Sequence, residues 1–219
     1  SLCIGAAAIW MFFGILFGYL SAVRAGSWLD RGLTVVAVAG ISMPVFWLAA
    51  ILINYLAYET GLFPSGGYVT LTAEPLEWAY HLILPWVTLA VIQIGFYSRV
   101  LRSNMLDAMA EDYVRTARAK GLSERQVMTR HVLRNSLIPI VTLFGLDVGV
   151  LLGGAILVEA LFNLNGIGQY AFESLQNFDL PPIMAITLFG AFFVVLFNAL
   201  SDIAYARLDP RVQLGGSAR

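Results

Sequence analysis

Five long apolar stretches constrain the fold of this chain more than any other feature of its sequence. They are residues 1–23, 32–58, 78–98, 137–158 and 182–204. Because about 20 residues of α-helix, rising ~1.5 Å each, cross the ~30 Å hydrocarbon core of a bilayer, each stretch is long enough for one span. A hydrophobic fraction of 59% against 12% charged residues lies outside the range of soluble domains. The sequence predicts an all-α polytopic membrane helical bundle with five transmembrane helices, one domain over residues 1–219.

The basic residues indicate how these spans are oriented. If the chain changes side at each span, all 13 Lys and Arg residues fall on the same side. The acidic residues of the outer segments, 59–77 and 159–181, have no basic neighbour there: Glu59, Glu74, Glu77, Glu159, Glu173 and Asp179. Because basic loops stay inside, the central loop at residues 103–136 is predicted to be cytoplasmic. Ser1 then faces outward and Arg219 inward.

The central loop has the residues of a helix that ends in a tight turn. Leu106 to Lys120 contains no Gly or Pro, and Glu111 can pair with Arg115 at helical spacing, which predicts a single helix. Gly121 is placed to end that helix in a left-handed conformation.

A second helix is predicted to follow the turn. Ser123 and Gln126 form an S-x-x-Q capping box, the usual start of a helix, and we expect it to run to about Arg134. The pattern alone also fits an ordinary amphipathic loop between two membrane helices.

The amino-acid sequence of this loop resembles that of a known protein family. Arg115-Thr116-Ala117, followed after three residues by Gly121, is similar to the "EAA" loop of ATP-binding-cassette importer permeases. The longer words DYVRTARAKGLSER (112–125) and RHVLRNSLIP (130–139) resemble the dipeptide and oligopeptide branch of that family. Arg-Thr replaces Glu-Ala and the gap from Gly121 to Pro139 exceeds the general spacing, but both departures are habits of the peptide branch.

The resemblance implies a fold, a role and partners. It implies a type I importer permease that forms the path for peptides across the bacterial cytoplasmic membrane. The partners would be a second related permease, two ATPase subunits and an external substrate-binding protein. The residues implied to dock on the ATPase are Arg115, Thr116, Ala117, Arg118, Lys120, Gly121, Leu122, Ser123 and Glu124. Small Ala117 and Gly121 would allow close approach, and Leu122 would supply an apolar plug.

Both outer segments contain further sequence motifs that resemble those of the peptide branch. Residues 61–68 read GLFPSGGY and residues 159–168 read EALFNLNGIG, where Asn165 stands in place of a Pro that is frequent in the family. A short amphipathic helix is predicted from Gln169 to Gln176. Members of this branch begin with one more membrane helix and an extracytoplasmic region, so we expect these to precede Ser1, giving six spans in the full chain.

The sequence argues against an enzyme. It contains no G-x-x-x-x-G-K-[ST] loop, so ATP and Mg²⁺ would be bound by partner subunits and no cofactor by this chain. Its single cysteine, Cys3, excludes an internal disulfide, and His81 and His131 lie too far apart to suggest a membrane-embedded active site. No nucleic-acid partner is expected.

Two other transport functions stay open at this point. Nickel and other small-solute importers share this permease branch, and the sequence does not identify the cargo. An ion-coupled secondary transporter would show internal repeats and several ionisable groups inside the spans. Within the interior of a span the one obvious acidic residue is Asp147.

Asp147 supports two hypotheses. It could line the translocation path with Asn198 and meet the amino end of a peptide, or it could form a structural hydrogen bond between helices, with Asn198 as the candidate partner. A glycine stripe on the same span, Gly145, Gly149 and Gly153-Gly154, predicts close packing of another helix. Pro44 is predicted to kink the second span, for gating or for packing.

Overall fold

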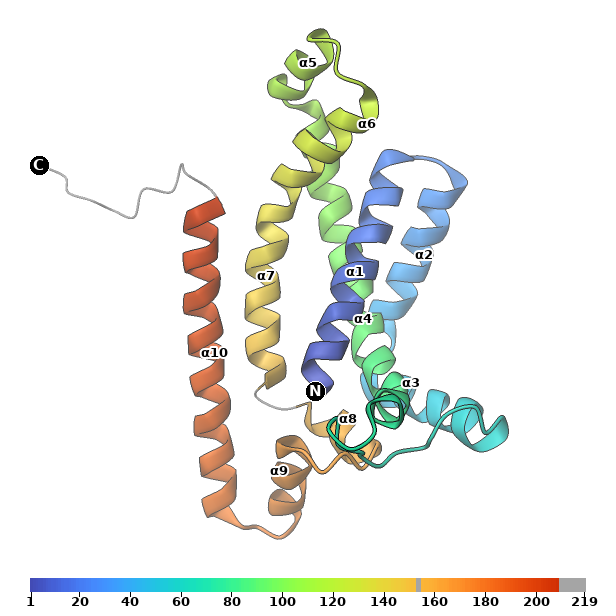
Figure 1. Cartoon of the computed structure of the whole chain (residues 1–219), viewed down its shortest axis with the longest axis vertical. Helices are drawn as coiled ribbons and strands as arrows, with labels where there is room; N and C mark the ends of the chain where they lie inside the picture. Colours follow the sequence, from blue (N-terminus) through green and yellow to red (C-terminus); the bar gives the residue numbers. More distant parts are fainter. Residues whose placement is uncertain (153–154, 209–219) are drawn as a thin grey trace, which may run out of the picture.

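The computed structural model describes residues 1–152 and 155–208, and over these residues it is helical with no strand (Figure 1). The elements in chain order are α1 (Leu2–Val23), α2 (Trp28–Ser42), α3 (Val45–Leu52), the π-helical segment η1 (Ile53–Glu59), α4 (Pro75–Ala110), α5 (Asp112–Ala119), α6 (Glu124–Gln126), the π-helical segment η2 (Val127–Leu133), α7 (Arg134–Leu152), α8 (Ile156–Leu161), α9 (Ile167–Gln176) and α10 (Leu180–Leu208).

Four helical stretches of the described chain are long and apolar enough to cross a membrane. They are Leu2–Val23, Pro75–Ala110, Glu124–Leu152 and Leu180–Ser201. The bent pair Trp28–Ser42 and Val45–Glu59 makes a fifth if its two halves count as one span. The all-α membrane bundle predicted from the sequence is therefore the fold observed.

The second predicted span, residues 32–58, is broken rather than straight. Its halves meet at 102°, so the effect predicted for Pro44 is confirmed but is much larger than a kink. The cause is local, because proline disfavours a helical conformation at the residue before it, and Met43 is extended at φ −83° and ψ 125°. Only α2 runs beside α1 and α4, while α3 lies across one end of the bundle (Figure 1).

The fourth span also differs from the prediction. The helix that begins at Glu124 continues without a break through η2 and α7 to Leu152, so it does not stop near Arg134. Pro139 lies inside α7. Val158, the predicted end of this span, belongs instead to the short helix α8. The π-helical turns of η2 join α6 to α7, so the second loop helix and the span form one continuous helix.

Glycines allow the spans to pack closely. A Cβ added at Gly14 of α1 would lie 2.8 Å from the Cβ of Tyr97 on α4, and one at Gly149 would lie 3.2 Å from the Cβ of Phe197 on α10. Gly145 faces Ser201 of α10 with no room for a side chain. The close packing predicted for the glycine stripe is thus confirmed at Gly145 and Gly149, while Gly153 and Gly154 lie outside the described residues.

The connections gather at the two ends of the bundle (Figure 1). One end holds the α1–α2 turn, α5, α6 and the last turns of α10, and the other holds Ser1, α3, α8 and α9. The basic central loop and the acidic outer segments, 59–77 and 159–181, thus lie at opposite ends, as the charge distribution predicted. We call the first the loop end and the second the outer end.

Candidate functional site

The loop helices begin with a break that the sequence did not reveal. The predicted single helix from Leu106 to Lys120 is wrong, because α4 ends at Ala110 and α5 begins at Asp112. Glu111 between them is extended, at φ −70° and ψ 149°, and acts as the N-cap of α5. Arg115 accordingly pairs with Asp112, N to O 3.6 Å, rather than with Glu111.

The break turns one face of α5 inward. Val114 is fully buried and Ala117 is 5% exposed, and both belong to the core that the spans build. That core continues through Met105 of α4 and Val127 of η2 to Trp10 of α1. The loop helices therefore share one apolar core with the membrane helices.

Gly121 ends α5 as predicted. Its φ is +82°, its N–H donates to the Arg118 carbonyl at 2.9 Å, and the Leu122 N–H donates to the Ala117 carbonyl at 3.4 Å. These two bonds are the Schellman pattern of a helix C-terminus, which needs a left-handed residue at this position. A Cβ at Gly121 would meet nothing within 4 Å, so the glycine is required for its backbone conformation and not for space.

The capping box predicted after the turn is also present. Ser123 and Gln126 form both halves of the capping box that starts α6. Across the turn, Arg118 donates two hydrogen bonds to Glu124, Nε to Oε2 at 3.0 Å and Nη2 to Oε1 at 2.7 Å. The Arg118 guanidinium lowers the pKa of the Glu124 carboxyl. The turn is thus held by backbone, cap and ion pair at once.

Most of the predicted docking residues form one exposed surface, which we call the turn surface. It consists of Arg115, Thr116, Arg118, Lys120, Gly121, Leu122, Ser123 and Glu124. Leu122 is its apolar member, with 37% of its surface exposed. Ala117 does not belong to it, because its methyl is buried in the core that the loop helices share with the spans. That Ala117 takes part in docking stays a prediction.

The proposed path residues are not joined to each other. The Asp147 carboxylate accepts a hydrogen bond from the Tyr97 hydroxyl, Oη to Oδ2 2.7 Å, and Tyr97 is fully buried beside Trp10. Asn198 has a buried Oδ1 without a hydrogen-bond partner among the described residues. Asp147 therefore makes the structural type of contact, with Tyr97 in place of the expected Asn198. That Asp147 and Asn198 line a path stays a prediction.

Sequence reasoning missed the role of Glu159, which it counted only as an outer charge. Glu159 is 8% exposed, and its Oε2 accepts hydrogen bonds from the backbone N–H groups of Gly168 at 2.6 Å and Gln169 at 3.1 Å. The carboxylate thus satisfies the free N–H groups at the start of α9.

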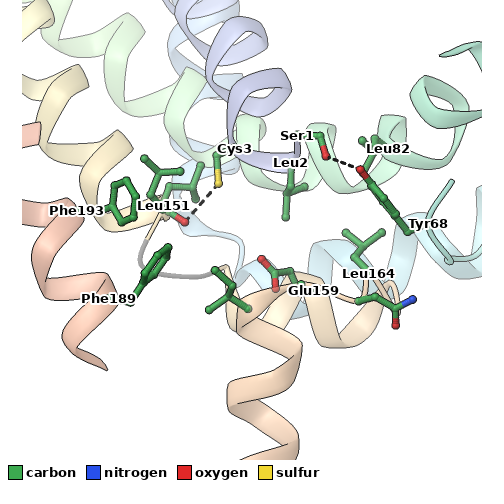
Figure 2. Close-up of a pocket in the computed structure, with 14 residues that line it drawn as sticks. Ser1, Leu2, Cys3, Tyr68, Leu82, Leu151, Glu159, Leu164, Phe189 and Phe193 are labelled. Atoms are coloured by element: carbon green, nitrogen blue, oxygen red, sulfur yellow. Dashed lines mark hydrogen bonds between the residues drawn. The ribbon is translucent and has the colours of Figure 1, made fainter. Parts of the chain in front are cut away.

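Glu159 also borders a cavity of about 350 Å³ at the outer end. Figure 2 shows its carboxylate among Leu2, Leu151 and Leu164, with Phe189 and Phe193 on the α10 side. Across the cavity the Tyr68 hydroxyl lies 3.3 Å from the Ser1 hydroxyl. The cavity therefore lies between the outer segments, the outer ends of α1 and α7, and the first half of α10.

Among known protein families, one model matches almost the whole chain. It is the binding-protein-dependent transport system inner membrane component, and the match covers residues 14–214.

Curated relatives match over the same length. A putative peptide transport system permease protein of Brucella abortus (strain 2308) is 41% identical over 213 residues, 97% of this chain and 68% of the relative. The oligopeptide transport system permease protein AppB of Bacillus subtilis (strain 168) is 43% identical over 201 residues, 91% of this chain and 64% of the relative. The di/tripeptide transport system permease protein DppB of Pseudomonas aeruginosa is 40% identical over 221 residues, 92% and 66%. The chain spans about two thirds of the length of each.

A solved structure shares the fold. The inward-facing MetNI methionine ABC transporter, in its CY5 native crystal form, superposes with a TM-score of 0.75 at 18% identity, over 95% of this chain and 91% of the matched one. At that identity the likeness concerns the fold, which is that of a type I importer permease.

Proposed function

The chain belongs to the family of binding-protein-dependent transport system inner membrane components, and we propose that it forms the path by which peptides cross a bacterial cytoplasmic membrane. Peptide is proposed as cargo because relatives about 40% identical over more than nine tenths of the chain are described as peptide, oligopeptide or di/tripeptide permeases. The permease itself would hydrolyse nothing.

The turn surface is the proposed contact with the ATPase subunits, and the contacts that fix its conformation are the observation that carries the proposal. A coupling contact must pass a displacement to the spans without deforming. The Schellman bonds at Gly121, the Ser123 capping box and the Arg118 to Glu124 pair fix the turn. The buried side of α5 joins it to the core of the spans.

The remaining partners and the orientation follow from the same proposal. ATP and Mg²⁺ would be bound on two ATPase subunits at the loop end, which is then cytoplasmic. A binding protein would deliver cargo to the outer end. Helix α10 leaves large apolar side chains exposed, including Leu188, Phe192 and Val195, and these suit lipid or a second, related permease subunit.

A reconstituted transporter tests this function. The full-length permease is purified with its co-expressed partner subunits, placed in vesicles with ATP, and assayed for uptake of a labelled dipeptide and a labelled tetrapeptide, with Ni²⁺ in a parallel set. We expect ATP-dependent peptide uptake and none of Ni²⁺. Nickel uptake without peptide uptake would replace the cargo, and uptake that follows an ion gradient without ATP would contradict the class of transporter.

A further inference from the structure

A bidentate ion pair, buried on its Asp30 side, ties the loop end of α4 to the first turn of α2. Arg102 of α4 donates from Nε to Asp30 Oδ1 at 2.7 Å and from Nη2 to Asp30 Oδ2 at 2.8 Å. The side chain of Asp30 is 5% exposed and that of Arg102 is 31% exposed. We call this pair the clasp.

The Asp30 side of the clasp is held in place by further hydrogen bonds. On the hairpin side, Asp30 Oδ1 also accepts a hydrogen bond from the Ser21 hydroxyl of α1, and Oδ2 accepts one from the Gly26 N–H at 2.8 Å. The Ser27 hydroxyl caps α2 by accepting from the Asp30 N–H at 3.2 Å. The carboxylate is therefore a junction between α1, the turn, α2 and α4.

Arg102 lies near the end of α4 that leads into the loop helices. It lies about two turns before α4 ends at Ala110, where the chain passes through Glu111 into α5. Next to it, Leu101 is fully buried, and a Cβ at Gly18 of α1 would lie 2.9 Å from the Leu101 Cβ. The clasp and this close contact fasten the end of α4 that carries the loop helices.

Stability alone is a poor reason for such a pair. Because 31% of the Arg102 side chain is exposed, solvent screens part of the attraction, and partly exposed ion pairs typically add little to stability. A bidentate Arg to carboxylate contact does impose one geometry. What it supplies is a defined position of one helix against another.

We infer that Asp30 and Arg102 are positioning residues for coupling: they make the α1–α2 hairpin and the loop end of α4 move as one body. The inference rests on the proposed function. When an ATPase subunit displaces the turn surface, a 36-residue helix held only by apolar contacts could slide or bend near its end. With the clasp closed, the displacement of α5 reaches α1 and α2 as well as α4.

Four variants of the full transporter test the inference. Asp30→Asn and Arg102→Gln cut the link from either side, and Arg102→Lys keeps a charge without the two-point fork. Ser21→Ala is the matched control, because it removes another donor to the same carboxylate and leaves the link to α4. Peptide transported per ATP hydrolysed is measured in vesicles, and co-purification and the melting temperature of the complex are measured in detergent.

We expect the first two variants to lower the transport ratio about fivefold, with Arg102→Lys between them and the wild type and Ser21→Ala within about twofold of it. ATPase subunits should still co-purify with all four. Unchanged ratios in Asp30→Asn and Arg102→Gln would overturn the inference. So would a common loss in all four that follows only their melting temperatures, since a structural role predicts that pattern.

A distance measurement tests the motion itself. Spin labels are placed at Arg31 and Asp107, two exposed positions on either side of the clasp. In the wild type the distance should be the same without nucleotide and with trapped ATP, and in Asp30→Asn it should broaden or change with nucleotide. A wild-type distance that itself changes with nucleotide refutes the one-body motion, whereas loss of ATP-dependent uptake in the wild type would refute the proposed function instead.

Discussion

Replacing Gly121 with valine should uncouple the transporter while leaving it in the membrane. The glycine has φ +82°, a conformation that costs an L-residue roughly 1–2 kcal/mol, with a β-branched residue at the upper end. Because a Cβ there meets nothing within 4 Å, the cost comes from the backbone and not from a clash. Since ~1.4 kcal/mol is a factor of ten, the docking-competent turn would lose about 5- to 30-fold in population.

Two further substitutions separate strain from obstruction of a partner. Gly61 also has a left-handed φ, +64°, and open space around its Cβ position, but it lies in the outer segment, so Gly61→Val applies the same type of strain away from the turn surface. Gly121→Asn keeps the left-handed conformation, which asparagine tolerates, and adds a side chain to the surface. If strain matters, Gly121→Asn resembles the wild type, and if close approach matters, it resembles Gly121→Val.

The assay is substrate-stimulated ATPase activity and peptide uptake in vesicles, with insertion and co-purification of the ATPase subunits measured on the same preparations. We expect Gly121→Val to lose stimulation and uptake, and Gly61→Val to keep both. Wild-type stimulation and uptake in Gly121→Val would place the coupling contact elsewhere. Equal losses in the two valine variants would mean that general destabilisation, and not docking, explains the effect.

Three more results are expected. In a background that lacks the native cysteine, a cysteine at Ser65 should react with an impermeant thiol reagent from outside and one at Ser123 only when the inner face is opened; the reverse pattern would invert the topology. Asp147→Asn keeps an acceptor for the Tyr97 hydroxyl, so uptake should be retained. Asp147→Leu removes that acceptor and should destabilise the complex by roughly 1–3 kcal/mol in thermal unfolding. If Asp147→Asn loses uptake while the complex keeps its stability, the negative charge of Asp147 acts in the translocation path. Glu159→Ala leaves two N–H groups of α9 without their acceptor and should lower the unfolding free energy by a similar ~1–3 kcal/mol. Glu159→Gln keeps an acceptor oxygen and should cost less. Wild-type stability in both variants would show that the cap is dispensable.

The local signals of the loop were predictable because their causes lie within a few residues. The turn at Gly121 depends on the backbone freedom of one residue, and the capping box depends on Ser123 and Gln126, three positions apart. The break at Glu111 was not predictable from propensity, since no Gly or Pro marks it. It depends on the burial of Val114 and Ala117 against η2, which is a tertiary contact.

Pro44 allowed the sequence to predict an interruption of the helix but not the size of the bend. Proline predicts that a helix is interrupted, but the size of the bend depends on what the second half packs against. Here Ala49 of α3 joins Leu82 of α4 and Phe162 after α8 in a second apolar core at the outer end. That core exists only when α3 turns across the bundle, so the 102° angle belongs to the packing and not to the proline alone.

Two polar contacts between distant residues were hard to see in the sequence, and α4 makes both. The clasp joins residues 72 positions apart, and the Tyr97 to Asp147 hydrogen bond joins residues 50 positions apart, so no spacing rule reveals either. Both are made by α4, at its loop end and at the depth of the spans. Because buried polar groups must find partners, each bond admits one register of α4 against its neighbours, α1 and α2 through Asp30 and α7 through Asp147. The helix that leads into α5 is therefore held by two polar contacts to its neighbours, which suits the proposed delivery of a displacement from α5 to those helices.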